Sequence, residues 1–219
     1  KKLHTNTLNG VILNKIQKNK VNNDVIKYSS VNIEIDRVKK VATISILAPN
    51  TPAPKEVEEI YSQGDQFWLL KCARELDDAI LYLRFNELEI GIILFKTIGK
   101  ISNVLSYDKL FDAHKNNWLI KEISFYWTRI FKRIDLTSRT LTTLIEPGSC
   151  YAGFLAELIF CADRSYMAEG AFEDFNDQEA VIILSNTNFG NFVMSNDMTR
   201  LNTRFIGLPE NLVLTEQSL

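Results

Sequence analysis

Alternating apolar and polar residues predict a pair of strands early in the chain. Val31, Ile33 and Ile35 alternate with polar neighbours, and a second apolar series covers residues 41–46. A period of two places successive side chains on opposite faces of a strand. The charged segment 36–40 separates the two series, so we expect a β-hairpin over residues 31–46.

Helical and strand patterns then alternate along the chain. Apolar residues recur every three or four positions over residues 66–85 and 118–134, which predicts two helices, and a third is expected over residues 153–162. Nearly continuous apolar runs are typical of buried strands, and they occur at 90–95, 141–145 and 181–184. Strands that alternate with helices predict an α/β fold built from β-α-β crossovers.

Composition separates the two ends of the chain from this α/β region. Residues 1–30 are rich in Lys and Asn and are interpreted as a connector, with one short amphipathic helix over residues 11–16 as an addition. We assign the domain to residues 31–210 and treat residues 211–219 as a tail. The chain begins with Lys1 rather than methionine, which we interpret as the mark of a fragment or a processed chain.

Charge and cysteine content narrow the classes of partner. The 219 residues include 25 Lys and Arg against 27 Asp and Glu, and a net charge of −2 does not favour a nucleic-acid or anionic-membrane surface. No apolar run approaches the ~20 residues of a membrane span, and no secretory leader is visible. Three cysteines without a close pair argue against a disulfide framework and favour a cytoplasmic location.

Common metal and nucleotide motifs are missing from the sequence. His4 and His114 are the only histidines, and neither has a cysteine or second histidine at ligand spacing, so no metal is expected. The glycine patterns of phosphate loops and dinucleotide folds do not occur either.

The segment best suited to chemistry surrounds Glu157. A buried strand ends near residue 145, a turn follows, and a helix is expected from Gly153. The first N–H groups of a helix have no internal partner and can stabilise a developing oxyanion. Glu157 lies one turn into this helix among apolar residues, where burial would raise its pKa and suit it to acid–base work. Alternatively, Glu157 caps nearby N–H groups or pairs with Arg164 or another cation.

The turn before this helix contains further pocket candidates. Cys150 lies in a tight Gly-Ser-Cys turn after a strand, where it is either a nucleophile or a packing residue. Glu146 stands at the strand end and faces either a cleft or its own turn, and Ser149 lies between these two residues. Glu122 is interpreted as part of a solvated helix face.

One stretch resembles the enoyl-CoA hydratase/isomerase, or crotonase, superfamily. Residues 153–163 spell GFLAELIFCAD, which is similar to the small residues and the E-L-A-x-x-x-D helix of crotonase-type enzymes. The resemblance places Glu157 at the catalytic-glutamate position and the backbone N–H of Phe154 at that of an oxyanion-hole donor. Gly153 then opens the glycine run.

The resemblance is closer to one branch, the second half of the benzoyl-CoA-dihydrodiol lyases. Blocks in the same order cover most of residues 31–207, namely ARELDDAILYLRFNELEIG, LIEPGSCYAGFLAEL, ADRSYM, NFG and TRLNTRFIG. This resemblance implies a crotonase-like spiral of β-β-α units. Because the chain stops at Leu219, we expect the C-terminal helices of such a domain to be missing.

The resemblance also implies an activity and partners. The family opens the ring of 2,3-epoxybenzoyl-CoA, formally a dihydrodiol, by C–C cleavage with release of formate in aerobic aromatic degradation. The substrate would be an acyl-CoA thioester, with no cofactor besides the CoA that belongs to it. A preceding crotonase-like half and a homo-oligomer are further expectations.

Two departures from the family pattern keep a second hypothesis open. Asn186 stands where a second glutamate is usual before Gly190, and an amide cannot act as a general base. Gly-Phe-Leu at residues 153–155 replaces a run of three glycines. The alternative is therefore a non-catalytic crotonase-like half that supports the folding or assembly of a catalytic partner half.

Overall fold

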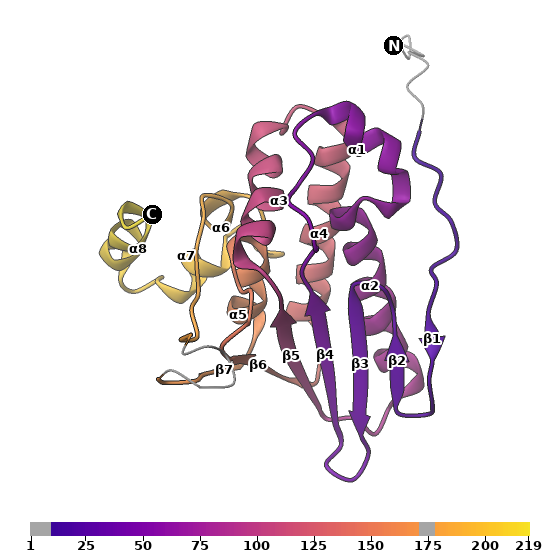
Figure 1. The fold of residues 1–219 in the computed structure, drawn as a ribbon. Coiled ribbons are helices and arrows are strands. Elements are labelled where there is room, and N and C mark those ends of the chain that lie inside the picture. The colour runs from indigo at the N-terminus through magenta and orange to yellow at the C-terminus, as the bar shows by residue number, and fades with distance from the viewer. Residues whose placement is uncertain (1–9, 171–177) are drawn as a thin grey trace.

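A mixed sheet carries the fold in the computed structural model, which describes residues 10–170 and 178–219 (Figure 1). Within these residues the sheet has seven strands, and they lie side by side in chain order. The strands are β1 (Asn19–Lys20), β2 (Val25–Lys27), β3 (Val31–Asp36), β4 (Val41–Leu47), β5 (Ile92–Ile98), β6 (Thr140–Ile145) and β7 (Arg164–Met167). Strands β1 to β4 pair antiparallel, and β4 to β7 pair parallel.

The hairpin predicted over residues 31–46 is confirmed. Strands β3 and β4 pair from Val31 opposite Ile46 to Asp36 opposite Val41. The inward side chains of β3, including Ile33, are buried, whereas Glu34 points to solvent. The alternation in the sequence therefore separates the two faces of the strand.

Helical crossovers join the parallel strands, as the α/β prediction requires. Between β4 and β5 lie α1 (Val57–Gln63), the 3-10 turn η1 (Gly64–Gln66) and α2 (Trp68–Asn86). Between β5 and β6 lie α3 (Ile101–Ala113) and α4 (Trp118–Asp135), and between β6 and β7 lie η2 (Gly153–Ala156) and α5 (Glu157–Cys161). The expected helices over residues 66–85 and 118–134 match α2 and α4.

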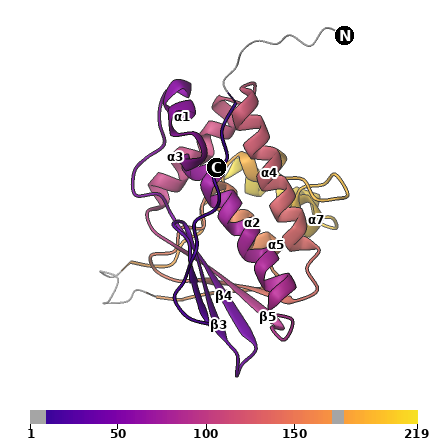
Figure 2. The same cartoon turned by 90° about the vertical axis from the view of Figure 1, so that its right-hand side faces the viewer.

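The core forms where these helices pack on the sheet (Figure 2). Helix α2 packs against β3 and β4, and α4 packs against α2. Trp127 of α4 is fully buried, and its indole N–H donates to the Leu69 carbonyl of α2 at 3.0 Å. The indole N–H of this large buried side chain therefore has an acceptor, which avoids the free-energy cost of an unpaired buried donor.

The N-terminal and C-terminal segments differ from their predictions. Residues 11–16 do not form a helix, and β1 and β2, inside the expected connector, extend the sheet. Most of the expected tail at residues 211–219 belongs to helix α8 (Pro209–Gln217). Sequence patterns also missed α1 and α3.

The strand predicted at residues 181–184 is wrong. Only an isolated parallel bridge joins Ala152 to Ile183, and Val181, Ile182 and Ile183 are 37–41% exposed. Beyond it lie the short helices α6 (Thr187–Gly190) and α7 (Arg200–Arg204). None of the helices in the described parts of the chain is both long and apolar enough to cross a bilayer.

Candidate active site

The turn after β6 uses its polar groups to hold its own shape. The hydroxyl of Ser149 accepts from the Glu146 N–H at 3.0 Å, and the Ser149 N–H donates to the Glu146 carbonyl at 2.9 Å. The Glu146 carboxylate points outward and pairs with Lys96 at 2.8 Å. Cys150 is fully buried, and burial raises the pKa of its thiol to about 11. A thiol with this pKa stays protonated at neutral pH and is a poor nucleophile.

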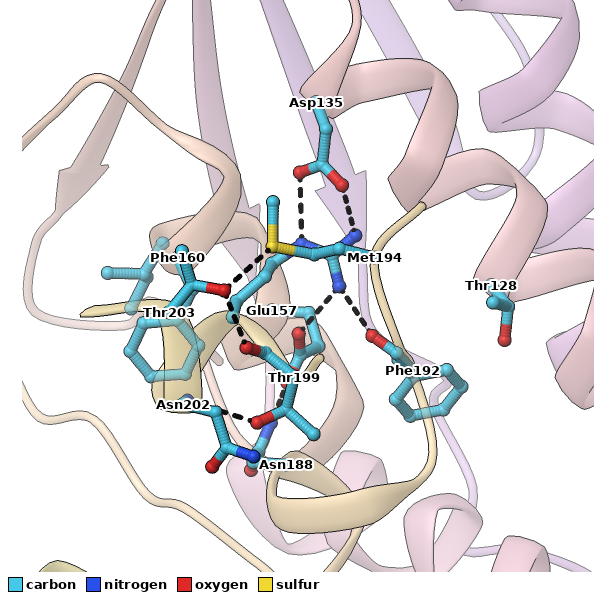
Figure 3. Close-up of polar contacts among 12 residues, drawn as sticks. Thr128, Asp135, Glu157, Phe160, Asn188, Phe192, Met194, Thr199, Asn202 and Thr203 are labelled. Carbon is cyan, nitrogen blue, oxygen red and sulfur yellow. Dashed lines mark hydrogen bonds and ion pairs between the residues drawn. The ribbon is translucent and has the colours of Figure 1, made fainter. Parts of the chain in front are cut away.

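Glu157 begins α5 and is almost completely enclosed, with 1% of its surface exposed. Its Oε1 accepts from the side-chain amide of Asn188 at 2.8 Å, and its Oε2 accepts from Arg200 at 3.0 Å (Figure 3). The same Asn188 amide donates to the Gly153 carbonyl at 3.0 Å. Asn188 and Arg200, which lie much later in the chain, therefore hold the Glu157 carboxylate and the Gly153 carbonyl.

Arg200 faces two carboxylates at once. Its Nε and Nη2 bond Asp135 in a fork, at 3.0 and 2.6 Å, while its Nη1 bonds Glu157 (Figure 3). The Phe192 carbonyl accepts from the same Nη1 at 2.8 Å, and the guanidinium carbon lies 5.3 Å from the centre of the Phe131 ring. Planar fork geometry suits arginine to this arrangement.

Burial and the charges of Arg200 and Asp135 together set the pKa of Glu157. Burial raises the pKa of Glu157 to about 7, although Arg200 and the Asn188 amide both favour the ionised form. One guanidinium cannot neutralise two carboxylates, and the negative charge of Asp135 adds to the rise. A carboxyl group with a pKa near 7 holds a proton in a large fraction of molecules at neutral pH.

The backbone N–H of Phe154, predicted as an oxyanion donor, already has a partner. It donates to Oδ1 of Asp108 at 2.7 Å, and the hydroxyl of Thr187 donates to the same oxygen at 2.7 Å. Asp108 comes from α3 and is 2% exposed. Burial raises the pKa of Asp108, against the stabilising hydrogen bonds of these donors.

Gly153 allows the backbone to approach Asp108 closely. Its φ is +50°, a conformation that side-chain-bearing residues rarely adopt. A Cβ at this position would lie 2.4 Å from Cγ of Asp108. Both the backbone conformation and the close approach therefore require glycine.

The structure brings together only part of the predicted site. Gly153, Phe154 and Glu157 lie together, and Cys150 and Ser149 lie in the turn that precedes them. Asn186 is exposed and makes no capping bond, whereas Asn188, two residues later, contacts Glu157. The sequence patterns did not indicate five residues of this network: Asp108, Asp135, Thr187, Asn188 and Arg200.

Neither Glu157 nor Phe154 reaches the surface of the molecule. A ligand can meet these groups only if the residues that cover them move. A groove of about 660 Å³ lies elsewhere, between α4 and the N-terminal segment, and is lined by side chains such as Leu13, Trp118 and Phe125. The part of the chain described here contains no cluster of His, Cys, Asp and Glu suited to a metal ion.

Comparison with known proteins finds solved enoyl-CoA hydratases with a partly similar arrangement. The enzyme from Bacillus halodurans matches 85% of this chain and 64% of its own, at 14% identity and a TM-score of 0.48. The enzyme from Shewanella pealeana matches 62% of this chain and 45% of its own, at 14% identity and a TM-score of 0.38. No protein-family model matches the sequence.

A comparison of sequences is more specific. The benzoyl-CoA-dihydrodiol lyase of Aromatoleum evansii is 42% identical over 178 residues, which make up 81% of this chain. The same match covers 31% of the relative, so the chain spans about a third of its length. The resemblance to benzoyl-CoA-dihydrodiol lyases that the sequence blocks indicated is thereby confirmed.

Proposed function

We propose that this chain is part of a ring-opening acyl-CoA lyase that acts on 2,3-epoxybenzoyl-CoA, formally benzoyl-CoA dihydrodiol. The reaction breaks a C–C bond and releases formate in aerobic aromatic degradation. The observation that carries the proposal is the 42% identity over 178 residues to a benzoyl-CoA-dihydrodiol lyase. In this proposal the enzyme is cytoplasmic, and CoA enters only as part of the substrate.

The geometry around Glu157 supports an acid–base role in such a reaction. The carboxyl group has a pKa of about 7 and stands one helical turn from the Phe154 N–H. Enzymes commonly raise a glutamate into this range by burial so that it transfers protons at neutral pH. In the proposal, Glu157 moves a proton and the Phe154 N–H stabilises negative charge on the thioester oxygen.

Access to these groups requires α6 and α7 to move. Asn188 of α6 and Arg200 of α7 both bond the Glu157 carboxylate. Thr187 of α6 lies against Asp108 beside the Phe154 N–H. Displacement of these two short helices would uncover the carboxylate, and Asp108 of α3 would also have to release the Phe154 N–H.

The test is Glu157→Gln in an intact lyase that contains this segment. We expect turnover to fall by about 100-fold or more, in line with the loss of a general acid or base. Circular dichroism should show an unchanged fold. Glu34→Gln, on the exposed face of β3, is the matched control and should keep full turnover. Unchanged turnover in Glu157→Gln would remove this residue from the mechanism.

Substrate class is tested on the chain itself by calorimetric titration. Benzoyl-CoA should bind saturably and more tightly than acetyl-CoA, and free CoA should bind least. Equal binding of the three compounds would contradict recognition of the aromatic acyl group. A folded chain that binds none of them would favour the second candidate function.

That second candidate is a non-catalytic half that supports a catalytic partner half. The closed trio of Glu157, Arg200 and Asp135 favours it, because an ion-paired, enclosed glutamate meets no substrate. In this alternative the apolar groove between α4 and the N-terminal segment receives the preceding crotonase-like half. Gly10, Val11 and Leu13 line that groove, so a preceding half would join the chain near it.

The groove can be tested by co-purification of this chain with the preceding segment of a lyase. Phe125→Glu should abolish co-purification, because Phe125 lines the groove and is 56% exposed. Phe85→Glu, on a side chain 70% exposed at the end of α2, should leave it intact. A stable contact should bury more than about 1,000 Å². Light scattering on the purified complex would also show whether it assembles further into a homo-oligomer.

A further inference from the structure

The ends of α2 and α4 form a basic hollow on the surface. It has a volume of about 550 Å³ and is lined by Arg84, Arg129, Lys132, Arg133, Leu136 and Ser138. Arg84 comes from the last turn of α2, and Lys132 and Arg133 come from the last turn of α4. Pockets of about 300–1,000 Å³ are the size that holds a bound group in proteins. The cationic walls of this hollow favour an acidic occupant.

The positive charge of the hollow is only partly neutralised. Asp77 pairs with Arg133 and, at 3.9 Å, with Arg129. The ion pairs between residues of the described segments include neither Arg84 nor Lys132. Helix C-termini attract cations, which explains the place of these side chains but not their excess over carboxylates. Four cations therefore share one paired carboxylate.

The rim of the hollow has two further features of a protein contact. Burial lowers the pKa of Arg139, and the charge of Arg84 lowers it further, while Glu87 offsets part of the effect. The cations at this end of the molecule thus repel one another. Leu136, in the wall of the hollow, is 72% exposed. Arginine and exposed apolar side chains together are typical of protein–protein interfaces, and complementary charge selects the partner.

The chain carries a matching acidic helix at the opposite end of the sheet. Glu56, Glu58 and Glu59, at the start of α1, are exposed, and Lys55 is the one cation next to them in sequence. As far as residues 10–170 and 178–219 form ion pairs, none of these glutamates takes part. Helix α1 follows the carboxyl end of β4, whereas α2 and α4 end just before the amino ends of β5 and β6 (Figure 1). Because these strands are parallel, the acidic helix and the basic hollow of one molecule cannot meet.

We propose that copies of this chain associate head to tail, with α1 of one copy docked in the basic hollow of the next. The carboxylates of Glu58 and Glu59 then face arginines, whose forked N–H groups suit a carboxylate. The contact joins two different surfaces, so it repeats from copy to copy and ends in a ring or a filament. It is independent of the proposed lyase function, because neither surface contains a residue of the candidate active site.

Sedimentation equilibrium of the whole chain is the first test. The screening length is about 30 Å in about 10 mM salt and about 3 Å in about 1 M salt. Association should therefore be clear in low salt and at least about tenfold weaker in high salt. A wild-type chain that stays monomeric in low salt up to about 1 mM protein overturns the proposal. Association that is equally strong in high salt also overturns it, because an apolar contact behaves in that way.

Charge reversal on either surface should prevent association. Glu58→Lys with Glu59→Lys reverses the helix, and Arg84→Glu with Lys132→Glu reverses the hollow. Each double variant should lose at least about tenfold in its association constant, since like charges would then meet. If circular dichroism shows that a reversed variant does not fold, the corresponding glutamine variant takes its place and should lose association in the same direction. A folded variant that associates like the wild type contradicts the proposal.

The matched control reverses two lysines that belong to neither surface. Lys20→Glu with Lys27→Glu alters exposed side chains of β1 and β2 and changes the net charge as much as the reversed hollow does. This control should associate like the wild type. Equal weakening in the control and in the hollow variant would mean that net charge, and not the hollow, governs association.

A mixture of the two reversed variants gives the sharpest result. The helix variant keeps an intact hollow and the hollow variant keeps an intact α1, so one contact can still form between them. We expect dimers with one copy of each variant and no larger assembly, whereas each variant alone stays monomeric. A mixture without dimers would mean that the two surfaces do not recognise each other. That result overturns the proposal and leaves the hollow to some other acidic protein.

Discussion

Oε2 of Glu157 lies 3.0 Å from Nη1 of Arg200, and both side chains are at most 2% exposed. The two residues are separated by 43 positions in the chain, and Arg200 reaches from α7 to α5 to make the contact. Through its bond to Asp135, the same guanidinium also holds the end of α4. One arginine thus joins the helix that carries the candidate acid to two other helices.

The raised pKa of Glu157 predicts a stability that falls with rising pH. The folded state holds the proton up to about pH 7, whereas the unfolded chain loses it near 4.5. The penalty for the ionised form is therefore absent below 4.5 and grows as the pH rises through about 7, to on the order of 3 kcal/mol. Urea unfolding at about pH 5 and pH 8 should show this loss in the wild type. The loss should be much smaller in Glu157→Gln, and equal losses in the two proteins would contradict the assignment.

Arg200→Met should strongly destabilise the chain. The substitution leaves Asp135 and Glu157 buried without their shared cation, a change expected to lower the free energy of unfolding by about 3–5 kcal/mol. In a double-mutant cycle at neutral pH, adding Glu157→Gln should recover little of the loss, because Arg200 lowers the pKa of Glu157 and without it this carboxyl group is mostly protonated. Arg164→Met, on an exposed arginine of β7, should be close to neutral in the same urea unfolding series. An Arg200→Met chain as stable as wild type would show that the trio contributes little.

Gly153→Ala should cost more than its backbone conformation alone explains. Gly64 also has a positive φ, of +55°, but a Cβ there would have nothing within 4 Å, so Gly64→Ala should lose only the ~1–2 kcal/mol of its backbone conformation. At Gly153 the added Cβ also meets the Asp108 carboxylate, and the total loss should be about 2–4 kcal/mol. Thermal unfolding of the two variants separates these contributions. Equal losses of stability in the two variants would mean that the Asp108 side chain moves aside at no cost in free energy.

The two asparagines near α6 should respond very differently to substitution. Asn188→Ala removes the donor shared by Glu157 and the Gly153 carbonyl, and should cost about 1–3 kcal/mol. Asn186→Ala alters an exposed side chain without a capping bond and should stay within about 0.5 kcal/mol of wild type. Urea unfolding of both variants measures the contrast. A larger effect at Asn186 than at Asn188 would contradict the part of Asn188 in holding Glu157 and the Gly153 carbonyl.

Elements with a strong period were predictable because their burial follows a regular geometry. The β3–β4 hairpin and the helices α2 and α4 each have a long, regularly spaced apolar face, although Glu75 and Asp77 are also buried on α2. Helix α3 was missed because Asn103 and Asp108 are buried on its inward face and interrupt the apolar stripe. The false strand at residues 181–184 shows the converse, since apolar composition alone does not tell which elements will cover a segment.

The candidate site was located from the sequence, but its partners were not. The sequence predicted a helix from Gly153 with Glu157 one turn into it, whereas the structure has the 3-10 turn η2 over Gly153–Ala156 and begins α5 at Glu157. Sequence proximity suggested Arg164 as a cation, whereas the actual partner is Arg200, which in turn holds Asp135. Arg200 is 43 positions from Glu157 and 65 from Asp135. Contacts over such separations depend on how the helices pack, which the local spacing of residues does not indicate.

The order of the strands has a consequence for synthesis on the ribosome. Each strand from β2 to β7 pairs with the strand that immediately precedes it in the chain. As the nascent polypeptide emerges, every new strand finds its template already in place, so the sheet can grow outward from β1 without waiting for later sequence. Thr187 and Arg200 emerge after all seven strands, and only then can Asp108, Asp135 and Glu157 complete their contacts. Until that moment the growing chain carries three acidic groups without their final contacts.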